Sequence, residues 1–367
     1  MAAKNSSVLF DMTMYSCYLL MTAGGKKEIN MLPKIALLAT GGTIASLQSE
    51  KGLAPAIHAL DILRLCPALS LSADITVRDV FSLDSSNIQP EEWVVLASAV
   101  REAAQSADGI VITHGTDTMA YSASALSFML QGLNIPVVFT GSQLPLQHPL
   151  SDAPGNLGEA FTVAMQASPG VYVVFHHKVI YGTRAVKLRT LSFDAFDSIN
   201  APAVGTFDAD GLHMQTSVSG CGKAKVFITD DEAARIDPRV FLLKLMPGTN
   251  PEIFKHIIRA GYQGLVMEAF GLGGLHYIRR NLLKSLEALS HSKILTLVTT
   301  QCLYEKADFS LYEVGRHVLQ SCIYGAHDMT TEAAVTKLMW VLGDRESRLP
   351  LLTQCLAQEM ISIPPDN

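Results

Sequence analysis

The chain has 367 residues, a formal net charge of −6 and 49% hydrophobic residues. At roughly 100–200 residues per domain, this length predicts two domains with a sizeable core. No basic stripe favours nucleic-acid binding, and no apolar run of about 18 residues predicts a membrane-spanning helix.

The first 30 residues carry no regular pattern, and we interpret them as a poorly ordered or mis-started extension. A secretory signal is the alternative, because Lys4 precedes an apolar stretch and small residues follow at Ala23. Asp11 and the short, mixed character of the apolar stretch argue against that alternative.

Regular structure is predicted from Met31 onwards, as short apolar strands that alternate with helices. The predicted strands span 34–39, 74–80, 109–113, 136–140 and 170–176, and the predicted helices 59–66, 90–106, 119–131 and 156–166. Pro90, Glu91 and Glu92 suit the first turn of a helix. Residues 46–55 are predicted to be a loop. The recurring order of strand, turn and helix predicts an α/β fold with a largely parallel sheet.

A change of pattern after residue 200 marks the predicted domain boundary. Residues 201–225 have little periodicity, so we expect an N-terminal α/β catalytic domain at 31–205, a linker at 206–225 and a smaller C-terminal α/β domain at 226–367. In the second domain, strands are predicted at 240–246, 264–268 and 294–299, and helices at 251–260, 276–289 and 331–342, with Asp328 near the last N-terminus.

Two loops follow predicted strands and carry the candidate chemistry. The first strand runs into Gly41-Gly42-Thr43, and the strand at 109–113 runs into Gly115-Thr116-Asp117. Ligand sites of open α/β sheets lie beyond the carboxyl ends of strands. A threonine hydroxyl needs a nearby base or a favourable electrostatic environment to act as a nucleophile. Together with Asp117, a lysine could supply these by orienting the carboxylate or accepting a proton. Glycine-turn N–H groups could stabilise an oxyanion.

Other chemistries have weaker support. The Gly-rich turns match neither of the phosphate-binding motifs Gly-x-Gly-x-x-Gly and Gly-x-x-x-x-Gly-Lys-Ser/Thr. The six dispersed cysteines form no Cys-x-x-Cys pair, so neither a zinc knuckle nor a redox motif is supported. His176 and His177 lack a further ligand at metal-site spacing, so they are interpreted as polar residues at a strand end. His114 could be a general base, but an imidazole bonded to the backbone of its tight turn is the preferred interpretation. No metal and no cofactor is predicted.

At these residues the sequence resembles the asparaginase/glutaminase family, and in detail the bacterial type I L-asparaginases. The matching segments are Thr40-Gly41-Gly42-Thr43-Ile44, residues 114–121, residues 122–130, Thr140-Gly141-Ser142-Gln143, Phe193-Asp194-Ala195-Phe196 and Asp328-Met329-Thr330. The resemblance covers about Met31 to Leu342.

The resemblance implies hydrolysis of L-asparagine to L-aspartate and ammonia through an acyl-enzyme. The family's nucleophile falls on Thr43, and its second threonine, aspartate and lysine fall on Thr116, Asp117 and Lys187. The substrate's α-amino and α-carboxylate groups would be bound by Asp84, Ser85, Ser86, Thr116 and Asp117. It also implies a cytoplasmic homo-oligomer, a dimer or tetramer.

Two positions depart from the family pattern. Leu53 stands where a loop tyrosine helps to activate the nucleophile, and leucine has no hydroxyl. An arginine and an asparagine of the type I regulatory site fall on Glu268 and Gly274, and an acid does not pair with a carboxylate as arginine does. We therefore expect the regulatory asparagine site to be lost.

The predicted function is that of an L-asparagine amidohydrolase with a small-molecule substrate and no nucleic-acid or membrane partner. Two alternatives stay open: a weakly active or inactive asparagine-binding sensor, which Leu53 favours, and an amidase subunit of a tRNA-dependent amidotransferase. The near-neutral charge argues against the tRNA alternative.

Overall fold

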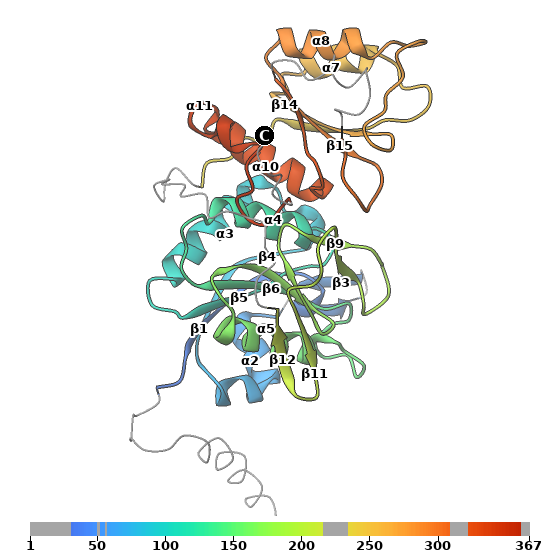
Figure 1. Ribbon diagram of the computed structural model, residues 1–367. Coiled ribbons are helices and arrows are strands. Elements are labelled where there is room, and N and C mark those ends of the chain that lie inside the picture. The colour runs from blue at the N-terminus through green and yellow to red at the C-terminus, as the bar shows by residue number, and fades with distance from the viewer. Residues whose placement is uncertain (1–30, 50–51, 56, 216–233, 309–321, 361–367) are drawn as a thin grey trace, which may run out of the picture. The chain divides into compact units, whose positions relative to one another are not determined.

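The computed structural model describes residues 31–49, 52–55, 57–215, 234–308 and 322–360. Residues 33–367 form one compact unit, which holds a large sheet and a smaller one with their helices (Figure 1). The predicted extension, residues 1–30, lies outside the described residues. No helix in the described part of the chain is long and apolar enough to cross a membrane.

The large sheet brings the ends of three parallel strands to one edge. In spatial order its strands are β12 (Gly211–Met214), β11 (Gly205–Asp208), β8 (Lys178–Tyr181), β7 (Gly170–Phe175), β6 (Pro136–Thr140), β5 (Gly109–Thr113), β1 (Lys34–Gly41) and β4 (Asp74–Leu83). The strands from β7 to β4 are parallel, and the other three pair in antiparallel fashion. Because β5, β1 and β4 are parallel neighbours, the loops that follow them emerge side by side.

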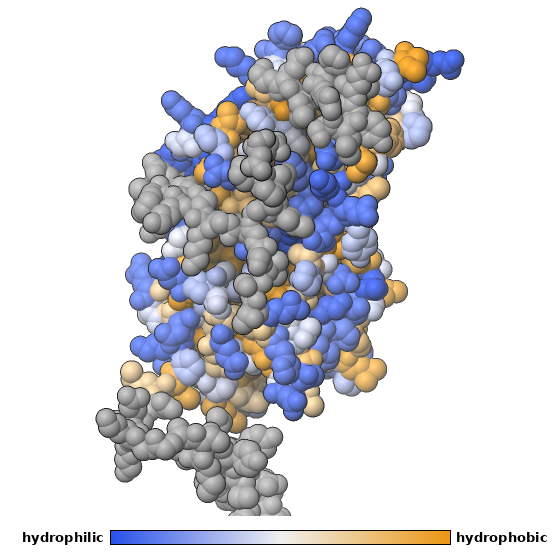
Figure 2. All heavy atoms as spheres, in the orientation of Figure 1, coloured by the Kyte–Doolittle hydropathy of each residue, from blue (hydrophilic) through white to orange (hydrophobic). Residues whose placement is uncertain are grey.

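Helices cover both faces of this sheet because its strands are apolar on both sides. They are α2 (Ala59–Leu65), α3 (Pro90–Ala103), α4 (Met119–Met129) and α5 (Ala153–Gln166). On β1, Ala36 and Leu38 join the apolar cluster of α3 and α4, whereas Ile35 and Leu37 join that of α2 and α5. On the face shown in Figure 2, hydrophilic residues predominate and hydrophobic ones lie between them in small groups.

The predicted start of α3 is confirmed by its hydrogen bonds. Pro90 occupies the first turn, and the N–H of Gln89 donates to Oε2 of Glu92 at 2.8 Å, which completes a capping box. These contacts satisfy N–H groups that have no partner inside the helix.

The smaller sheet is wholly parallel in its described strands. They are, in order, β13 (Val240–Lys244), β14 (Gly264–Ala269), β15 (Leu295–Thr300) and β16 (Ile323–Gly325). One face packs against α7 (Glu252–Arg259) and α8 (Leu283–His291), which lie side by side in Figure 1. The other face packs against α10 (Thr331–Gly343), which also contacts α4, so one apolar cluster extends from the large sheet's helices to β14 and β15.

Two segments differ from the sequence-based expectations. Residues 205–214, most of them expected in the linker, form β11 and β12 of the large sheet; these four-residue strands are too short and too polar to give a periodic signal. The expected loop at 46–55 holds a hairpin of β2 (Ser46–Ser49) and β3 (Gly52–Pro55). The rest of the expected linker, 216–225, lies outside the described residues.

Of the second-domain helices, α10 begins at Thr331 as predicted, whereas α8 begins later than expected. The helix predicted at 276–289 begins only at Leu283, because Arg280 has a φ of 50° and Oδ1 of Asn281 accepts from the Leu283 N–H at 2.9 Å. The cap of α10 is Thr330, whose Oγ1 accepts from the Ala333 N–H at 3.1 Å. Asp328, expected near this cap, pairs instead with Arg184.

A buried ion pair fixes the segment after α10. Nζ of Lys337 lies 2.6 Å from Oε1 of Glu359, and both side chains are 0% exposed. Glu359 also accepts from the N–H groups of Leu356 and Ala357, and Lys337 donates to the Gln354 carbonyl. The two Lys337 contacts tie α10 to residues 354–359, and the Glu359 contacts with Leu356 and Ala357 fix the fold of that segment.

We expect Lys337→Met to lower the free energy of unfolding by about 3–5 kcal/mol, because Glu359 would be left as an unpaired buried charge. Urea denaturation monitored by circular dichroism measures the change. Lys255→Met is the control, since the Lys255–Glu252 pair is 59% and 55% exposed and should matter little. Equal effects of the two substitutions would contradict the prediction.

Candidate active site

The first candidate loop turns sharply at two glycines with positive φ. Gly41 has a φ of 100° and Gly42 a φ of 79°, values that side chains rarely adopt. A Cβ on Gly42 would lie 2.4 Å from Cα of Gly115, so the two candidate loops touch backbone to backbone. Directly after this contact, the half-buried Thr43 opens a short 3-10 helix, Thr43–Ala45.

The second candidate loop fits between the first loop and the segment at 84–86. A Cβ on Gly115 would lie 2.6 Å from both Cβ and Oγ of Ser85, so only glycine fits without movement. Oγ1 of Thr118 donates to the Ser85 carbonyl at 2.8 Å. Three segments that are far apart in sequence, and that follow the neighbouring strands β1, β4 and β5, therefore meet at one place.

Lys187 reaches the second loop from a different part of the large domain. It ends the three-residue strand β9 (Ala185–Lys187), which pairs with β10 (Phe196–Ser198). Its Nζ donates to Oγ1 of Thr116 at 2.7 Å and to Oδ1 of Asp117 at 2.6 Å. Lys187 is 16% exposed, whereas Asp117 is 62% exposed, so the carboxylate faces solvent while the ammonium is largely covered.

Gln143 is a member of this hydrogen-bond set that the sequence reasoning did not assign to the site. Its Oε1 accepts from Oγ1 of Thr116 at 3.3 Å, and its Nε2 donates to the carbonyls of Thr190 and Ser192. The backbone N–H of Gln143 donates to the carboxylate of Asp152. Since Thr116 accepts from Lys187 and donates to Gln143, its hydroxyl proton has a defined direction. The sequence signal that could have identified Gln143 was its place in the family-matching segment Thr140-Gly141-Ser142-Gln143.

The segment at 84–86 presents one buried and two exposed side chains. Ser85 is 3% exposed, whereas Asp84 and Ser86 are exposed. Oδ1 of Asp84 accepts from the Ser86 N–H at 2.8 Å and caps the short 3-10 helix Ser85–Asn87. This bond fixes the carboxylate of Asp84 beside the two serines.

His114 supports the second loop and is fully buried. Its Nδ1 lies 2.7 Å from the Gly115 carbonyl and therefore donates, and its Nε2 has no hydrogen-bond partner among the described residues. Burial lowers the pKa of the imidazole to about 4. The interpretation of a backbone-bonded histidine is confirmed, and a neutral ring in this position holds the peptide that leads into Thr116.

The buried imidazole predicts a loss of stability in acid. Its pKa is about 4 in the fold against 6.5 for the free side chain, so below pH 6.5 the unfolded chain takes up the proton first. We expect the free energy of unfolding to fall by up to about 3 kcal/mol between pH 6.5 and pH 4 from this group. His114→Gln, which does not titrate, should show a shallower fall in urea denaturation. Identical pH profiles would contradict this assignment.

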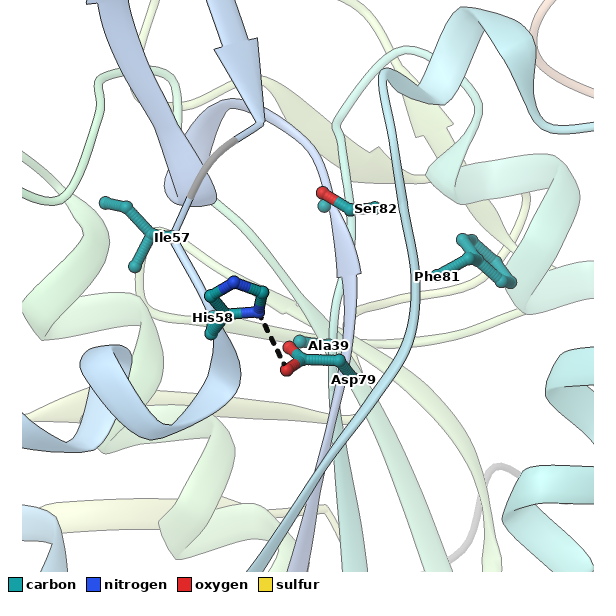
Figure 3. A pocket seen from close by; sticks show the side chains of 7 residues that line it. Ala39, Ile57, His58, Asp79, Phe81 and Ser82 are labelled. Atoms are coloured by element: carbon teal, nitrogen blue, oxygen red, sulfur yellow. Dashed lines mark hydrogen bonds and ion pairs between the residues drawn. The ribbon is translucent and has the colours of Figure 1, made fainter.

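A small cavity lies behind the first candidate loop. It has a volume of about 140 Å³ and is lined by Ala39, Gly41, Ile57, His58, Asp79, Phe81 and Ser82 (Figure 3). Nδ1 of His58 lies 3.0 Å from Oδ2 of Asp79, and Oδ1 of Asp79 accepts from the Ala59 N–H. These contacts tie the start of α2 to strand β4. None of the predicted site residues lines this cavity.

A larger cavity of about 290 Å³ contains Glu268. Oε1 of Glu268 accepts from Oγ1 of Thr331 at 2.6 Å, and Oε2 of Glu268 lies 3.2 Å from Nζ of Lys244. Burial raises the pKa of Glu332, and Glu268 raises it further. Burial and both carboxylates raise the pKa of Tyr121 to about 12. Glu268, where the type I regulatory site has an arginine, is thus an acid that has hydrogen-bond and ion-pair partners of its own.

Fold and site together are those of a two-domain α/β enzyme with threonine hydroxyls and a lysine at the carboxyl ends of its strands. Two family models match the chain: "Asparaginase, N-terminal" over residues 34–219 and "Glutaminase/Asparaginase C-terminal domain" over residues 239–349. The chain belongs to the asparaginase/glutaminase family of hydrolases. This membership confirms the predicted fold class of two α/β domains.

The chain is similar to proteins of two kinds. The L-asparaginase of the archaeon Thermococcus kodakarensis is 45% identical over 311 residues, which cover 84% of this chain and 93% of that protein. A solved structure of a thermostable L-asparaginase from the same organism is 42% identical and matches with a TM-score of 0.81, covering 90% of this chain and all of that one. A glutamyl-tRNA(Gln) amidotransferase subunit of Methanosarcina mazei is 35% identical, and the match covers 86% of this chain and 75% of the relative.

Proposed function

We propose that the chain is an L-asparagine amidohydrolase that produces L-aspartate and ammonia. The observation that carries the proposal is the set formed by Lys187, Thr116 and Asp117, with hydrogen bonds of 2.7 and 2.6 Å, beside the loop of Thr43. The 45% identity to an L-asparaginase over most of both chains supports the choice of substrate.

In the first step of the proposed reaction, Oγ1 of Thr43 attacks the carbonyl carbon of the substrate's side-chain amide. The hydroxyl proton passes to the leaving nitrogen, ammonia departs, and an aspartyl ester of Thr43 remains. Backbone N–H groups of the adjoining glycine turns are the candidate donors to the tetrahedral oxyanion. The contact between Gly42 and Gly115 holds the two loops against each other next to Thr43.

In the second step, water attacks the ester carbon and releases L-aspartate. Thr116 is the group we propose to orient this water, because its hydroxyl is fixed by Lys187 on one side and Gln143 on the other. The Thr43 oxygen recovers its proton as the ester bond breaks, so the enzyme returns to its starting state. Fixing the reacting groups in this way removes entropy from the barrier.

For binding, we propose that Asp117 and Asp84 receive the substrate's α-ammonium group, while Ser85 and Ser86 face its α-carboxylate. Asp117 is 62% exposed and already paired with one cation, so it can accept a second without losing Lys187. We further propose a cytoplasmic homo-oligomer, a dimer or tetramer, as in the type I branch.

A second candidate is amide hydrolysis within a tRNA-dependent amidotransferase. The 35% identity to the amidotransferase subunit of Methanosarcina mazei favours it. A third, an asparagine sensor, rests on Leu53, whose position in β3 opposite Gln48 puts leucine in the hairpin that follows the nucleophile. The presence of Thr43 together with Thr116, Asp117 and Lys187 argues for turnover, because a pure binder has no need of the nucleophile.

Ammonia release from L-asparagine and L-glutamine by the purified protein tests these functions. We expect release from asparagine to exceed release from glutamine, although one methylene is worth only about 1–3 kcal/mol in a pocket. Preferential use of glutamine would favour the amidotransferase candidate. Binding of asparagine without release would favour the sensor.

The regulatory asparagine site of the type I branch is proposed to be absent. Glu268, held by Thr331 and Lys244, would repel the carboxylate of a bound effector. In isothermal titration with a Thr43→Ala variant, we expect one asparagine per subunit and no second site. A second asparagine bound at micromolar concentration outside the active site would contradict the proposal.

A further inference from the structure

A buried arginine lies three residues before Lys187. Arg184 is 2% exposed and stands in the turn between β8 and β9. Its Nε donates to the Gln358 carbonyl at 2.7 Å, and its Nη1 to the Asp328 carbonyl at 3.0 Å. These acceptors lie after the smaller sheet, more than 140 residues further along the chain, so the strand that carries Lys187 is fixed from outside its own domain.

The partner carboxylate is buried as well. Oδ2 of Asp328 lies 2.9 Å from Nη1 of Arg184, and its side chain is 6% exposed. Two neutral contacts accompany the pair: Nδ2 of Asn200 donates to the Asp328 carbonyl, and Oγ1 of Thr183 donates to the Ala357 carbonyl. The charges are therefore neutralised and hydrogen-bonded, the condition under which buried ions are retained.

Strand β9 packs against α4 but has little strand pairing. It is three residues long, and its only named strand partner among the described residues is β10. The Arg184 carbonyl accepts from the Ile199 N–H at 3.0 Å, which begins that ladder. At the other end, Lys187 must reach Thr116 and Asp117. The arginine thus fixes the end of the strand opposite to the residue that enters the site.

We propose that Arg184 is a positioning residue for Lys187, and that its pairing with Asp328 couples the segment before α10 to the catalytic set. The inference rests on the proposed function, because it assumes that Lys187 acts in turnover. Its physical basis is that a displacement of about 1 Å at a catalytic group can cost about a hundredfold in rate.

The chain contains a matched control for the stabilising effect of a buried pair. Lys337 and Glu359 are also buried and also hold residues 354–359, but neither contacts β9. Removal of either pair should weaken the docking of the C-terminal segment. Only removal of the Arg184–Asp328 pair should also release the strand of Lys187.

The test compares two double variants, Arg184→Met with Asp328→Leu and Lys337→Met with Glu359→Leu, in steady-state ammonia release and thermal unfolding. We expect both to unfold at lower temperature. Only the first should lose about ten- to hundredfold in kcat, with KM within about threefold of the wild type. Equal losses of kcat in both variants, or wild-type kcat in the first, would overturn the inference.

Asp328→Asn is the milder variant if the first double variant does not fold. It keeps an acceptor for Arg184 and removes the charge, so a smaller fall in kcat at unchanged KM is expected, and an unchanged kcat overturns the inference. The wild-type control separates the two claims. An inactive wild type removes the proposed function and this inference with it, whereas an active wild type with unaffected variants removes the inference alone.

Discussion

Thr43→Ala is expected to reduce ammonia release from L-asparagine by about ten-thousandfold or more, the scale on which removal of a nucleophile acts. Without the hydroxyl no ester can form, and the remaining groups only orient the substrate. Binding should persist, because the residues proposed to hold the α-amino and α-carboxylate groups are untouched. Steady-state ammonia release and isothermal titration measure the two effects.

The control for Thr43→Ala is Thr43→Ser, which keeps a hydroxyl in the first turn of the 3-10 helix Thr43–Ala45. Serine should retain measurable turnover. If alanine and serine variants lose activity alike, the methyl group and not the hydroxyl matters. If the alanine variant keeps a tenth of the wild-type rate, another residue is the nucleophile.

Lys187→Met is expected to lower kcat by about 10²–10⁴-fold, the range for a group that controls proton movement. Methionine has a similar length but no donor, so Thr116 and Asp117 lose hydrogen bonds of 2.7 and 2.6 Å. Lys178→Met is the matched control. Lys178 lies on the neighbouring β8 and pairs with Asp194 at 2.9 Å, away from Thr116.

For these lysines, kcat and KM are measured with L-asparagine at constant pH. We expect the Lys178 variant to stay within about threefold of the wild type, since it loses a partly exposed ion pair. Similar losses in both variants would mean that the region tolerates no change of charge. A Lys187 variant with normal kcat would remove this residue from the mechanism.

The meeting of the two glycine loops could be predicted from sequence because it follows from strand geometry. Apolar runs ending at Gly41 and Thr113 predict parallel strands, and neighbouring parallel strands bring their loops together. Lys187 could not be found in this way. It enters from a three-residue strand 71 residues after Thr116, and only the family resemblance indicated it.

Other features were hidden because short or charged segments give no periodic signal. Strands β11 and β12 are four residues each, and the helix expected from 276 begins only at Leu283 because the positive φ of Arg280 leaves no mark in composition. Arg184 and Asp328 resemble surface charges in sequence. Their burial depends on contacts between residues 144 positions apart, which the sequence pattern does not encode.

The most direct test of the account identifies the residue that carries the acyl group. The protein is mixed with L-asparagine, quenched in acid within the first turnovers, digested and examined by mass spectrometry. The account predicts an aspartyl group esterified to Thr43, and no adduct in the Thr43→Ala variant. An aspartyl group on Thr116 or on any other residue would contradict it.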